Sequence, residues 1–454
     1  MKKGYVSVVV ALVLVLGLSL LCTFFFPVGD SKSFKKTSCL TDSITENMSR
    51  QEIATLYKSG TVAVYVESTY RSGFQTITQS SLGSGVCVAS IGYQAGEYSV
   101  SEGSYFVTNY HVINVAVEED FSNYDTSVSI VLDDGNYTAY SAEVLWASQE
   151  LDMALLFCDE QIDGLQWIEM KDRSINPAEG DQLGFDEVFT LGTPLNLQYI
   201  NTLSLGYVSN TSAKESASTK DFYYWTDSDG SITGTSNASN AVGSFMGTQP
   251  TEVLENMYED LIMINLDITH GNSGGGLFDS EGYLIGLTTL GLTYEDTNGA
   301  QMNFAVPIYP LTQILDKIIL QNEQGGSAVI SYQTLGLNVA DANMTSMTKS
   351  IQEQMGVSFY YIDGMIVEES QSSLLDFEGE GVVVLANSGT GLIANLTAGT
   401  VITGADFGNA SERVDINDRN DLIFFLLQCD SGDMIHVYYR ANGSERESSM
   451  YVQL

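Results

Sequence analysis

Ser273 lies in a glycine-rich stretch that could make its hydroxyl a nucleophile. In Gly271-Asn-Ser-Gly-Gly-Gly-Leu277, the flanking glycines allow a tight backbone path with positive φ, which points two N–H groups into one cavity beside the hydroxyl. A serine hydroxyl is a poor nucleophile until a base removes its proton, and a carboxylate must orient that base. The stretch therefore predicts acyl-transfer chemistry, with Ser273 as the nucleophile and the N–H groups of Gly271 and Ser273 as the oxyanion hole.

The base must come from one of only three histidines, His111, His270 and His436. His111 follows the run Tyr105–Thr108, where a strand is expected to end in a polar turn that presents the imidazole at the edge of a barrel. His270 is a competing base, but three residues before the nucleophile on the same turn it is poorly placed for in-line proton transfer. His436 lies in an apolar strand pattern and is expected to be structural. We therefore predict that His111 is the base.

Asp152 is the candidate carboxylate because it is the one acid at the head of the otherwise apolar run Leu151–Phe157. The chain order His111, Asp152, Ser273 is that of the chymotrypsin-type barrel and differs from the orders in subtilisin and in the α/β-hydrolases. Each residue alone has an unreactive interpretation, as a surface histidine, a strand-end cap or a plain turn. Their joint occurrence in this order favours a catalytic triad for peptide-bond hydrolysis, and the order disfavours an esterase.

Many short strands must position these residues. Runs of β-branched and aromatic residues bounded by Gly, Asn, Asp and Ser predict strands at Thr61–Val66, Gly85–Ala89, Tyr105–Thr108, Ser127–Leu132, Met153–Phe157 and Tyr283–Thr289. Such a pattern indicates barrels or sandwiches, so the fold class is mainly β. Residues 209–251 are rich in Ser, Thr, Asn and Gly and predict a long inserted loop. Helical spacing appears at 311–320 and again at 421–428, and strands are expected around 435–439 and 449–454.

The charge of the chain excludes one class of partner. The sequence has 18 Lys and Arg against 57 Asp and Glu, a formal net charge of -39. Nucleic-acid affinity depends on Lys and Arg that neutralise phosphates. We therefore expect no nucleic-acid partner.

The cysteines indicate neither a metal site nor a disulfide framework. They are scattered and have no zinc-like spacing, as Cys22, Cys39, Cys87, Cys158 and Cys429. Cys87 and Cys158 could pair only if their Cα atoms lie within about 7 Å. No metal and no cofactor is expected.

The N-terminus has the pattern of a membrane anchor. Residues 6–26 are uncharged and almost wholly apolar, and as a helix they would rise about 31 Å, the thickness of a bilayer core. A cleaved signal peptide has a shorter apolar region that ends in small residues, whereas this one ends in three phenylalanines and Pro27. We predict a cytoplasmic stub and transmembrane signal anchor at 1–27 that contacts membrane lipid, and a polar tether at 28–50. Lysines on both sides nearly balance the positive-inside count, but the short leader favours a single-pass cell-membrane protein with its later domains extracytoplasmic.

Around His111, Asp152 and Ser273 the sequence resembles the HtrA/DegP-like trypsin-fold serine proteases. The matching motifs run along the chain as Gly83-Ser-Gly85, Val107-Thr-Asn-Tyr-His111-Val, Leu151-Asp-Met-Ala-Leu155, Leu191-Gly-Thr-Pro194, Gly271-Asn-Ser-Gly-Gly275 and Asn303-Phe-Ala-Val-Pro307. The resemblance covers about 50–320 and implies a chymotrypsin-like double β-barrel protease domain, assigned to 51–324. It also implies a homotrimer of protease barrels and cleavage of misfolded or exposed envelope proteins.

By the same resemblance, 330–454 should be a PDZ-like α+β domain. Thr334-Leu-Gly-Leu337 resembles the family's carboxylate-binding loop, and Ala398-Gly-Thr-Val-Ile402 resembles its Gly-Asp-Val-Ile turn. This chain departs from the family at two points, since Thr400 replaces the usual acid and 338–380 is longer. We expect capture of peptide C-termini by strand addition at the loop residues Leu335, Gly336 and Leu337.

The sequence thus predicts a membrane-anchored serine endopeptidase for protein quality control, with His111, Asp152 and Ser273 as its triad and a PDZ-like domain that regulates it. Its substrates would be unfolded or misfolded extracytoplasmic proteins. The alternative is a catalytically silent, membrane-tethered chaperone or PDZ scaffold, in which the triad is present but never aligned.

Overall fold

The computed structural model describes most of the chain after residue 38. The described residues are 39–44, 48–72, 75–117, 124–149, 151–171, 186–215, 222–226, 232–236, 252–254, 258–293, 301–325, 335–342, 359–362, 365–368, 380–408, 413–441, 444 and 446–454. The predicted anchor at 6–26 and most of the predicted tether lie outside them. In the part of the chain that is described, no helix combines the length and hydropathy that a membrane crossing requires.

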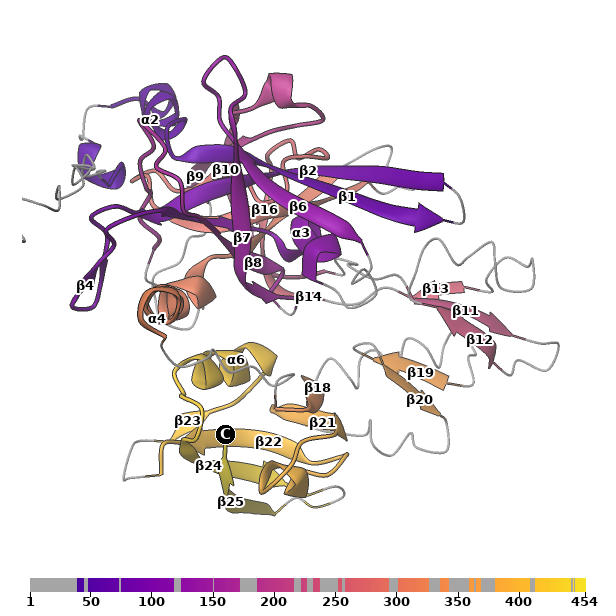
Figure 1. Ribbon diagram of the computed structural model, residues 1–454. Helices are drawn as coiled ribbons and strands as arrows, with labels where there is room; N and C mark the ends of the chain where they lie inside the picture. Colours follow the sequence, from indigo (N-terminus) through magenta and orange to yellow (C-terminus); the bar gives the residue numbers. More distant parts are fainter. Residues whose placement is uncertain are drawn as a thin grey trace, which may run out of the picture. The chain divides into compact units, whose positions relative to one another are not determined.

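The first half of the described chain closes into a six-stranded antiparallel barrel (Figure 1). Its interior is filled by aliphatic and aromatic side chains that alternate with outward-facing ones, which is the pattern expected of strands with one buried face. The strands follow one another around the barrel as β1 (Thr61–Ser72), β2 (Gln75–Ser90), β5 (Ser104–Thr108), β8 (Met153–Cys158), β7 (Ala139–Ser148) and β6 (Asp125–Val131). A small hairpin of β3 (Gln94–Ala95) and β4 (Tyr98–Ser99) extends from it.

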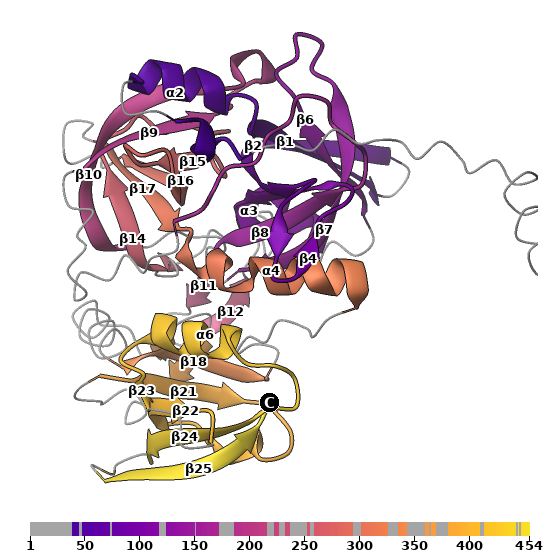
Figure 2. The same cartoon turned by 90° about the vertical axis from the view of Figure 1, so that its left-hand side faces the viewer.

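The following segment closes into a second six-stranded antiparallel barrel, best seen in Figure 2. Its strands are ordered as β10 (Thr202–Glu215), β14 (Tyr258–Ile264), β17 (Gln301–Pro307), β16 (Leu284–Thr293), β15 (Gly276–Phe278) and β9 (Glu187–Gly192). The prediction of a mainly-β double barrel is therefore confirmed.

Helices pack against the barrels where their apolar faces can be buried. α2 (Arg50–Tyr57) starts with a capping box between Ser49 and Glu52, and its Tyr57 ring packs edge-on against Phe189 and Phe278. α4 (Tyr309–Gln324) corresponds to the helix predicted at 311–320 and buries a stripe of leucine and isoleucine. Short 3-10 turns are η1 (Thr41–Ser43), η4 (Leu197–Tyr199) and η8 (Ile393–Asn395).

The region predicted as a long loop at 209–251 differs from that expectation. β10 runs on to Glu215, and β11 (Phe222–Thr226), β12 (Ile232–Ser236) and β13 (Glu252–Leu254) form a three-stranded sheet in the order β12-β11-β13. The polar composition concealed an aromatic run, Phe222–Trp225, whose residue types favour a strand. The intervening residues of the predicted loop lie outside the described part.

The described residues of the C-terminal part include an antiparallel sheet and the helix α6. The helix α6 (Arg419–Leu427) is capped by the Asp418 side chain, which accepts a hydrogen bond from the Asp421 N–H. The sheet order is β18 (Leu337–Asp341), β21 (Val382–Asn387), β22 (Val401–Asp406), β24 (Met434–Arg440) and β25 (Glu447–Gln453), with β23 (Val414–Asp415) paired to β22. A separate hairpin is formed by β19 (Phe359–Ile362) and β20 (Met365–Glu368).

The four cysteines in the described residues are buried, and none of them is in a disulfide. Cys87 lies opposite Phe106 on β5, and Phe106 lies opposite Leu156 on β8, so Cys87 and Cys158 are on strands two places apart in the barrel. Two strand spacings are about 9.5 Å, which is beyond the reach of a disulfide. Both cysteines are therefore small apolar core residues.

Candidate active site

His111 and Asp152 form a direct pair at the mouth of the first barrel. His111 is the second residue of α3 (Tyr110–Val117), so the predicted polar turn is in fact the first turn of a short helix whose apolar residues pack on the barrel. Asp152 directly precedes β8, as predicted, and has a positive φ of 46°. The Nδ1 atom of His111 lies 3.0 Å from both carboxylate oxygens of Asp152.

The Asp152 carboxylate is buried and receives donors from two further groups. Asp152 is only 1% exposed, and besides the imidazole it accepts the backbone N–H of His111 at 3.1 Å and the hydroxyl of Thr289 at 2.7 Å. Burial of the imidazole lowers the pKa of His111, but the charge of Asp152 and its hydrogen bond raise it by more, so the pKa of His111 lies above its ordinary value. The pair thus orients the imidazole and stabilises its charged form.

Ser273 reaches this pair through Thr289. The Ser273 hydroxyl donates to the backbone carbonyl of Thr289 at 3.0 Å, and the hydroxyl of the same threonine donates to Asp152. The Ser273 carbonyl accepts the backbone N–H of Ser84, on β2 of the first barrel, at 2.8 Å. The fold therefore brings all three predicted residues to one place, with the Ser273 hydroxyl turned toward Thr289.

Asn109 ties the backbone around all three residues together. It is fully buried, two residues before His111, and its Nδ2 donates to the Asp152 carbonyl at 2.8 Å while its Oδ1 accepts the Gly274 N–H at 2.6 Å. One amide side chain thus joins the histidine turn, the aspartate and the residue after the nucleophile. Because these groups belong to both barrels, Asn109 fixes the barrels to each other at the site.

The loop before Ser273 leaves two N–H groups for a ligand. The His270 carbonyl accepts the Leu195 N–H at 2.7 Å, and the Gly271 carbonyl accepts the Ser84 hydroxyl at 2.7 Å. In a trans peptide the C=O and N–H point in opposite directions, so the first bond turns the Gly271 N–H away from Leu195. Within the described residues, the N–H groups of Gly271 and Ser273 have no acceptor, as an oxyanion hole requires.

Glycine is required at the turn itself. Gly271 has a φ of 95°, and a Cβ atom there would lie 2.3 Å from the Thr193 carbonyl oxygen. Gly274 has a φ of 81°, and a Cβ atom would lie 2.2 Å from the Ser84 carbonyl oxygen. Both positions combine a left-handed backbone with contact to neighbouring backbone, so no other residue fits without displacing the loop.

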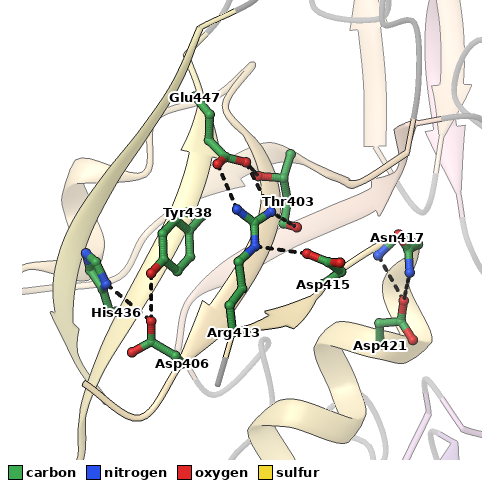
Figure 3. Close-up of polar contacts among 9 residues, drawn as sticks. All are labelled: Thr403, Asp406, Arg413, Asp415, Asn417, Asp421, His436, Tyr438 and Glu447. Carbon is green, nitrogen blue, oxygen red and sulfur yellow. Dashed lines mark hydrogen bonds and ion pairs between the residues drawn. The ribbon is translucent and has the colours of Figure 1, made fainter. Parts of the chain in front are cut away.

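The other two histidines lie elsewhere. His270 is exposed on the turn before the nucleophile. His436 lies on β24 of the C-terminal sheet, where its Nδ1 atom is 3.3 Å from the Asp406 carboxylate (Figure 3). Thr289, Asn109 and Ser84 are the site residues that the sequence did not predict, although Asn109 and Ser84 stand inside motifs already noted beside the triad.

The expected carboxylate loop stands at the start of β18, which is an edge strand among the described strands of its sheet. Gly336 has a φ of 76°, and its carbonyl accepts the Ser388 N–H at 2.7 Å. Leu337 is buried at the first position of β18, and Leu335 packs against the apolar core. The hydrogen bond from Ser388 to the Gly336 carbonyl therefore holds the loop in place.

Known proteins similar to this chain are proteases. Residues 83–287 match the family described as the trypsin-like peptidase domain. The chain is 23% identical to the serine protease Do-like HtrA of Lactococcus lactis subsp. cremoris over 93% of this chain and 87% of that protein. It is 26% identical to the serine endoprotease DegS of Salmonella typhimurium over 57% of this chain, and 24% identical to the chloroplastic protease Do-like 5 of Arabidopsis thaliana over 48% of this chain. It spans about half the length of these last two relatives, 54% of each.

Solved structures are also similar over most of both chains. Among them, the HtrA-type protease AlgW with a decapeptide aligns with a TM-score of 0.46 and 18% sequence identity, over 88% of this chain and 96% of that chain.

Proposed function

We propose that this chain, which is similar to the trypsin-like peptidase domain over 83–287 and to HtrA-type serine proteases, is an endopeptidase whose catalytic triad is Ser273, His111 and Asp152. The observation that carries this proposal is the buried Asp152 carboxylate, which holds the imidazole by Nδ1 and so leaves Nε2 free to face a substrate. The N–H groups of Gly271 and Ser273, which have no acceptor among the described residues, supply the second requirement of acyl transfer.

Catalysis starts from the hydrogen bond between the Ser273 hydroxyl and the Thr289 carbonyl. Rotation about the Ser273 Cα–Cβ bond carries the hydroxyl to His111 Nε2, which takes the proton as Ser273 Oγ attacks the peptide carbonyl. The carbonyl oxygen gains negative charge and is bound by the N–H groups of Gly271 and Ser273. His111 then gives its proton to the leaving amine, and a water molecule repeats the sequence on the acyl-enzyme, while Asp152 stabilises the imidazolium in both halves.

The experiment is proteolysis of an unfolded model substrate such as casein. Ser273→Ala should abolish nearly all cleavage, because the acyl-enzyme cannot form without the hydroxyl. Circular dichroism of the variant shows that the barrels remain folded. Retention of most of the activity by the folded variant would refute the assignment.

A catalytically silent scaffold is the second candidate, and one observation favours it. The Ser273 hydroxyl donates to Thr289 rather than to His111, which is the arrangement expected if the triad never aligns. In that case wild-type protein and Ser273→Ala would bind unfolded proteins equally and neither would cleave them. Turnover by wild-type protein alone eliminates this candidate.

The C-terminal sheet and α6 are proposed to form a PDZ-like domain that regulates cleavage. In support, β18 is an edge strand among the described strands and begins directly after Leu335 and Gly336, so an added peptide strand would place its carboxylate at that loop. Full-length Ser273→Ala should bind peptides with a free C-terminal carboxylate and discriminate against the same peptides amidated. Equal affinity for both forms would refute carboxylate capture.

The cellular role is proposed as quality control of misfolded extracytoplasmic proteins by a homotrimer anchored in the cell membrane. The anchor assignment depends on the apolar residues 6–26. Alkaline extraction of membranes should retain the full chain and release a chain that starts at residue 38. Release of both would refute the anchor.

A further inference from the structure

Leu195 combines two features that a leucine rarely has. Its side chain is 69% exposed, and its backbone has a φ of 63°, in the left-handed region that favours glycine or asparagine. Neither feature helps the chain to fold, because the apolar side chain stays in water and the backbone is strained. Strained residues held in place by their surroundings are concentrated at functional sites, which directs attention to what Leu195 adjoins.

The strained segment is bonded to the oxyanion loop. The Leu195 N–H donates to the His270 carbonyl at 2.7 Å, and the Asn196 N–H donates to the Pro194 carbonyl at 2.7 Å. Two residues before Leu195, the Thr193 N–H donates at 2.8 Å to the Ser84 hydroxyl, which itself donates to the Gly271 carbonyl. Residues 193–196 therefore form a hydrogen-bonded segment, the Leu195 rim, beside the N–H groups proposed to bind the oxyanion.

The position of this rim indicates which half of a substrate it would meet. The Ser273 hydroxyl and the Asp152 carboxylate both bond to Thr289, so the strand β16 that contains Thr289 borders one side of the nucleophile. A peptide extends in two directions from the carbon that Ser273 attacks. The acyl half can pair with the backbone that follows Thr289, which leaves the Leu195 rim, whose backbone adjoins His270 and Gly271 in the oxyanion loop, for the leaving half.

We propose that Leu195 is a specificity-determining residue that provides an apolar contact for the substrate side chain immediately after the scissile bond. This inference rests on the proposed protease function. Covering part of an exposed leucine with an apolar side chain should favour leucine over glycine at that substrate position by about fivefold. The left-handed backbone then has a use, because it directs the side chain outward while the N–H remains bonded to His270.

The test uses two quenched fluorescent peptides that are identical except for leucine or glycine after the scissile bond. Wild-type protein should cleave the leucine peptide with a kcat/KM about fivefold above that of the glycine peptide. Leu195→Asn keeps the N–H and tolerates a positive φ, and should reduce this ratio to below twofold. Leu205→Asn is the matched control, since Leu205 is another exposed leucine, on β10, and this variant should keep the wild-type ratio.

Each result has a distinct meaning. Failure of wild-type protein to cleave either peptide would refute the protease function itself. An unchanged ratio in Leu195→Asn would overturn the inference and leave the protease function intact. If kcat/KM also fell equally on both peptides, Leu195 would serve only to hold the oxyanion loop.

Discussion

Among the described residues there are two His–Asp pairs, and the first of them lies beside the proposed nucleophile Ser273. His111 and Asp152 lie 3.0 Å apart at the junction of the barrels, and His436 and Asp406 lie 3.3 Å apart on the C-terminal sheet (Figure 3). Both aspartates are nearly buried and both contact Nδ1 of their histidine. By distance and burial alone the pairs are almost equivalent.

Their surroundings separate them. Asp406 also accepts the Tyr438 hydroxyl at 2.8 Å and the Gly408 N–H at 2.7 Å, and the His436 ring is stacked on Tyr451 at 4.6 Å. Burial raises the pKa of Asp406, but these hydrogen bonds outweigh it and hold the pKa below its ordinary value. The bonds of Asp406 with Tyr438 and His436 join β22 to β24, and the bond from the Gly408 N–H closes a turn directly after β22. The second pair therefore stabilises the sheet. The first pair differs because Ser273, and N–H groups without acceptors among the described residues, lie beside it.

An adjacent ion-pair cluster also stabilises this sheet. The Arg413 guanidinium donates to Glu447 on β25 at 2.7 Å and 3.1 Å and lies 2.9 Å from Asp415, while its plane covers the Tyr438 ring at 4.6 Å (Figure 3). It also donates to the Thr403 carbonyl at 3.0 Å. One arginine therefore links β22, β23, β24 and β25, which is a role in stability.

The largest expected difference between the pairs comes from removing each carboxylate charge. Asp152→Asn should lower kcat by about 10³- to 10⁴-fold, because the amide would hold the wrong imidazole tautomer and could not stabilise the imidazolium. Asp406→Asn, the matched substitution in the other pair, should change kcat by less than about twofold. Steady-state peptide cleavage measures both, and similar losses in the two variants would abolish the distinction.

The pH profile should report the first pair. His111 must be neutral to accept the proton, so kcat/KM should fall about tenfold per pH unit below its pKa. Because the pKa of His111 is raised by Asp152, this fall should begin above the ordinary histidine range, at an apparent pKa higher than about 6.5. Asp406→Asn should leave the apparent pKa in place. A profile that stays flat down to pH 6 would contradict the raised pKa.

A smaller effect on kcat is expected from removing the Thr289 hydroxyl, which donates to Asp152 of the first pair. Thr289→Val removes the hydroxyl that donates to Asp152 but keeps the backbone carbonyl that holds Ser273. We expect about a 3- to 20-fold loss in kcat, with KM little changed, since the carboxylate loses one of its donors. Thr289→Ser, which restores the hydroxyl, should recover most of the rate. Failure of the serine variant to exceed the valine variant would show that the hydroxyl does not contribute.

The smallest effect on activity belongs to the second pair, where the change should be in stability. Asp406→Asn should weaken the C-terminal sheet by about 1–2 kcal/mol, through poorer hydrogen bonds from Tyr438 and His436. Hydrogen exchange should then speed up at β22 and β24 and remain unchanged in the barrels. Unchanged exchange at those two strands would show that the pair does not fasten them.

The residue types and their order were enough to predict His111, Asp152 and Ser273, because acyl transfer admits few combinations and the flanking glycines mark the loop. Thr289 and Asn109 were missed because their partners are 137 and 165 residues away in the chain, for Asp152 and Gly274 respectively, and only the closed barrels bring them together. The helix at His111 was missed because its residues also suit a strand edge. The strands within 209–251 were missed because the polar composition of this segment predicts a loop.

The most direct test of the catalytic centre is covalent labelling with a fluorophosphonate, which reacts only with an activated serine hydroxyl. Intact-mass and peptide analysis of wild-type protein should find one adduct, on Ser273, and His111→Ala should abolish it. His436→Ala, the matched change in the second pair, should label at the wild-type rate. A wild-type protein that cleaves peptides but carries no adduct on Ser273, or one whose labelling survives His111→Ala, would contradict the account.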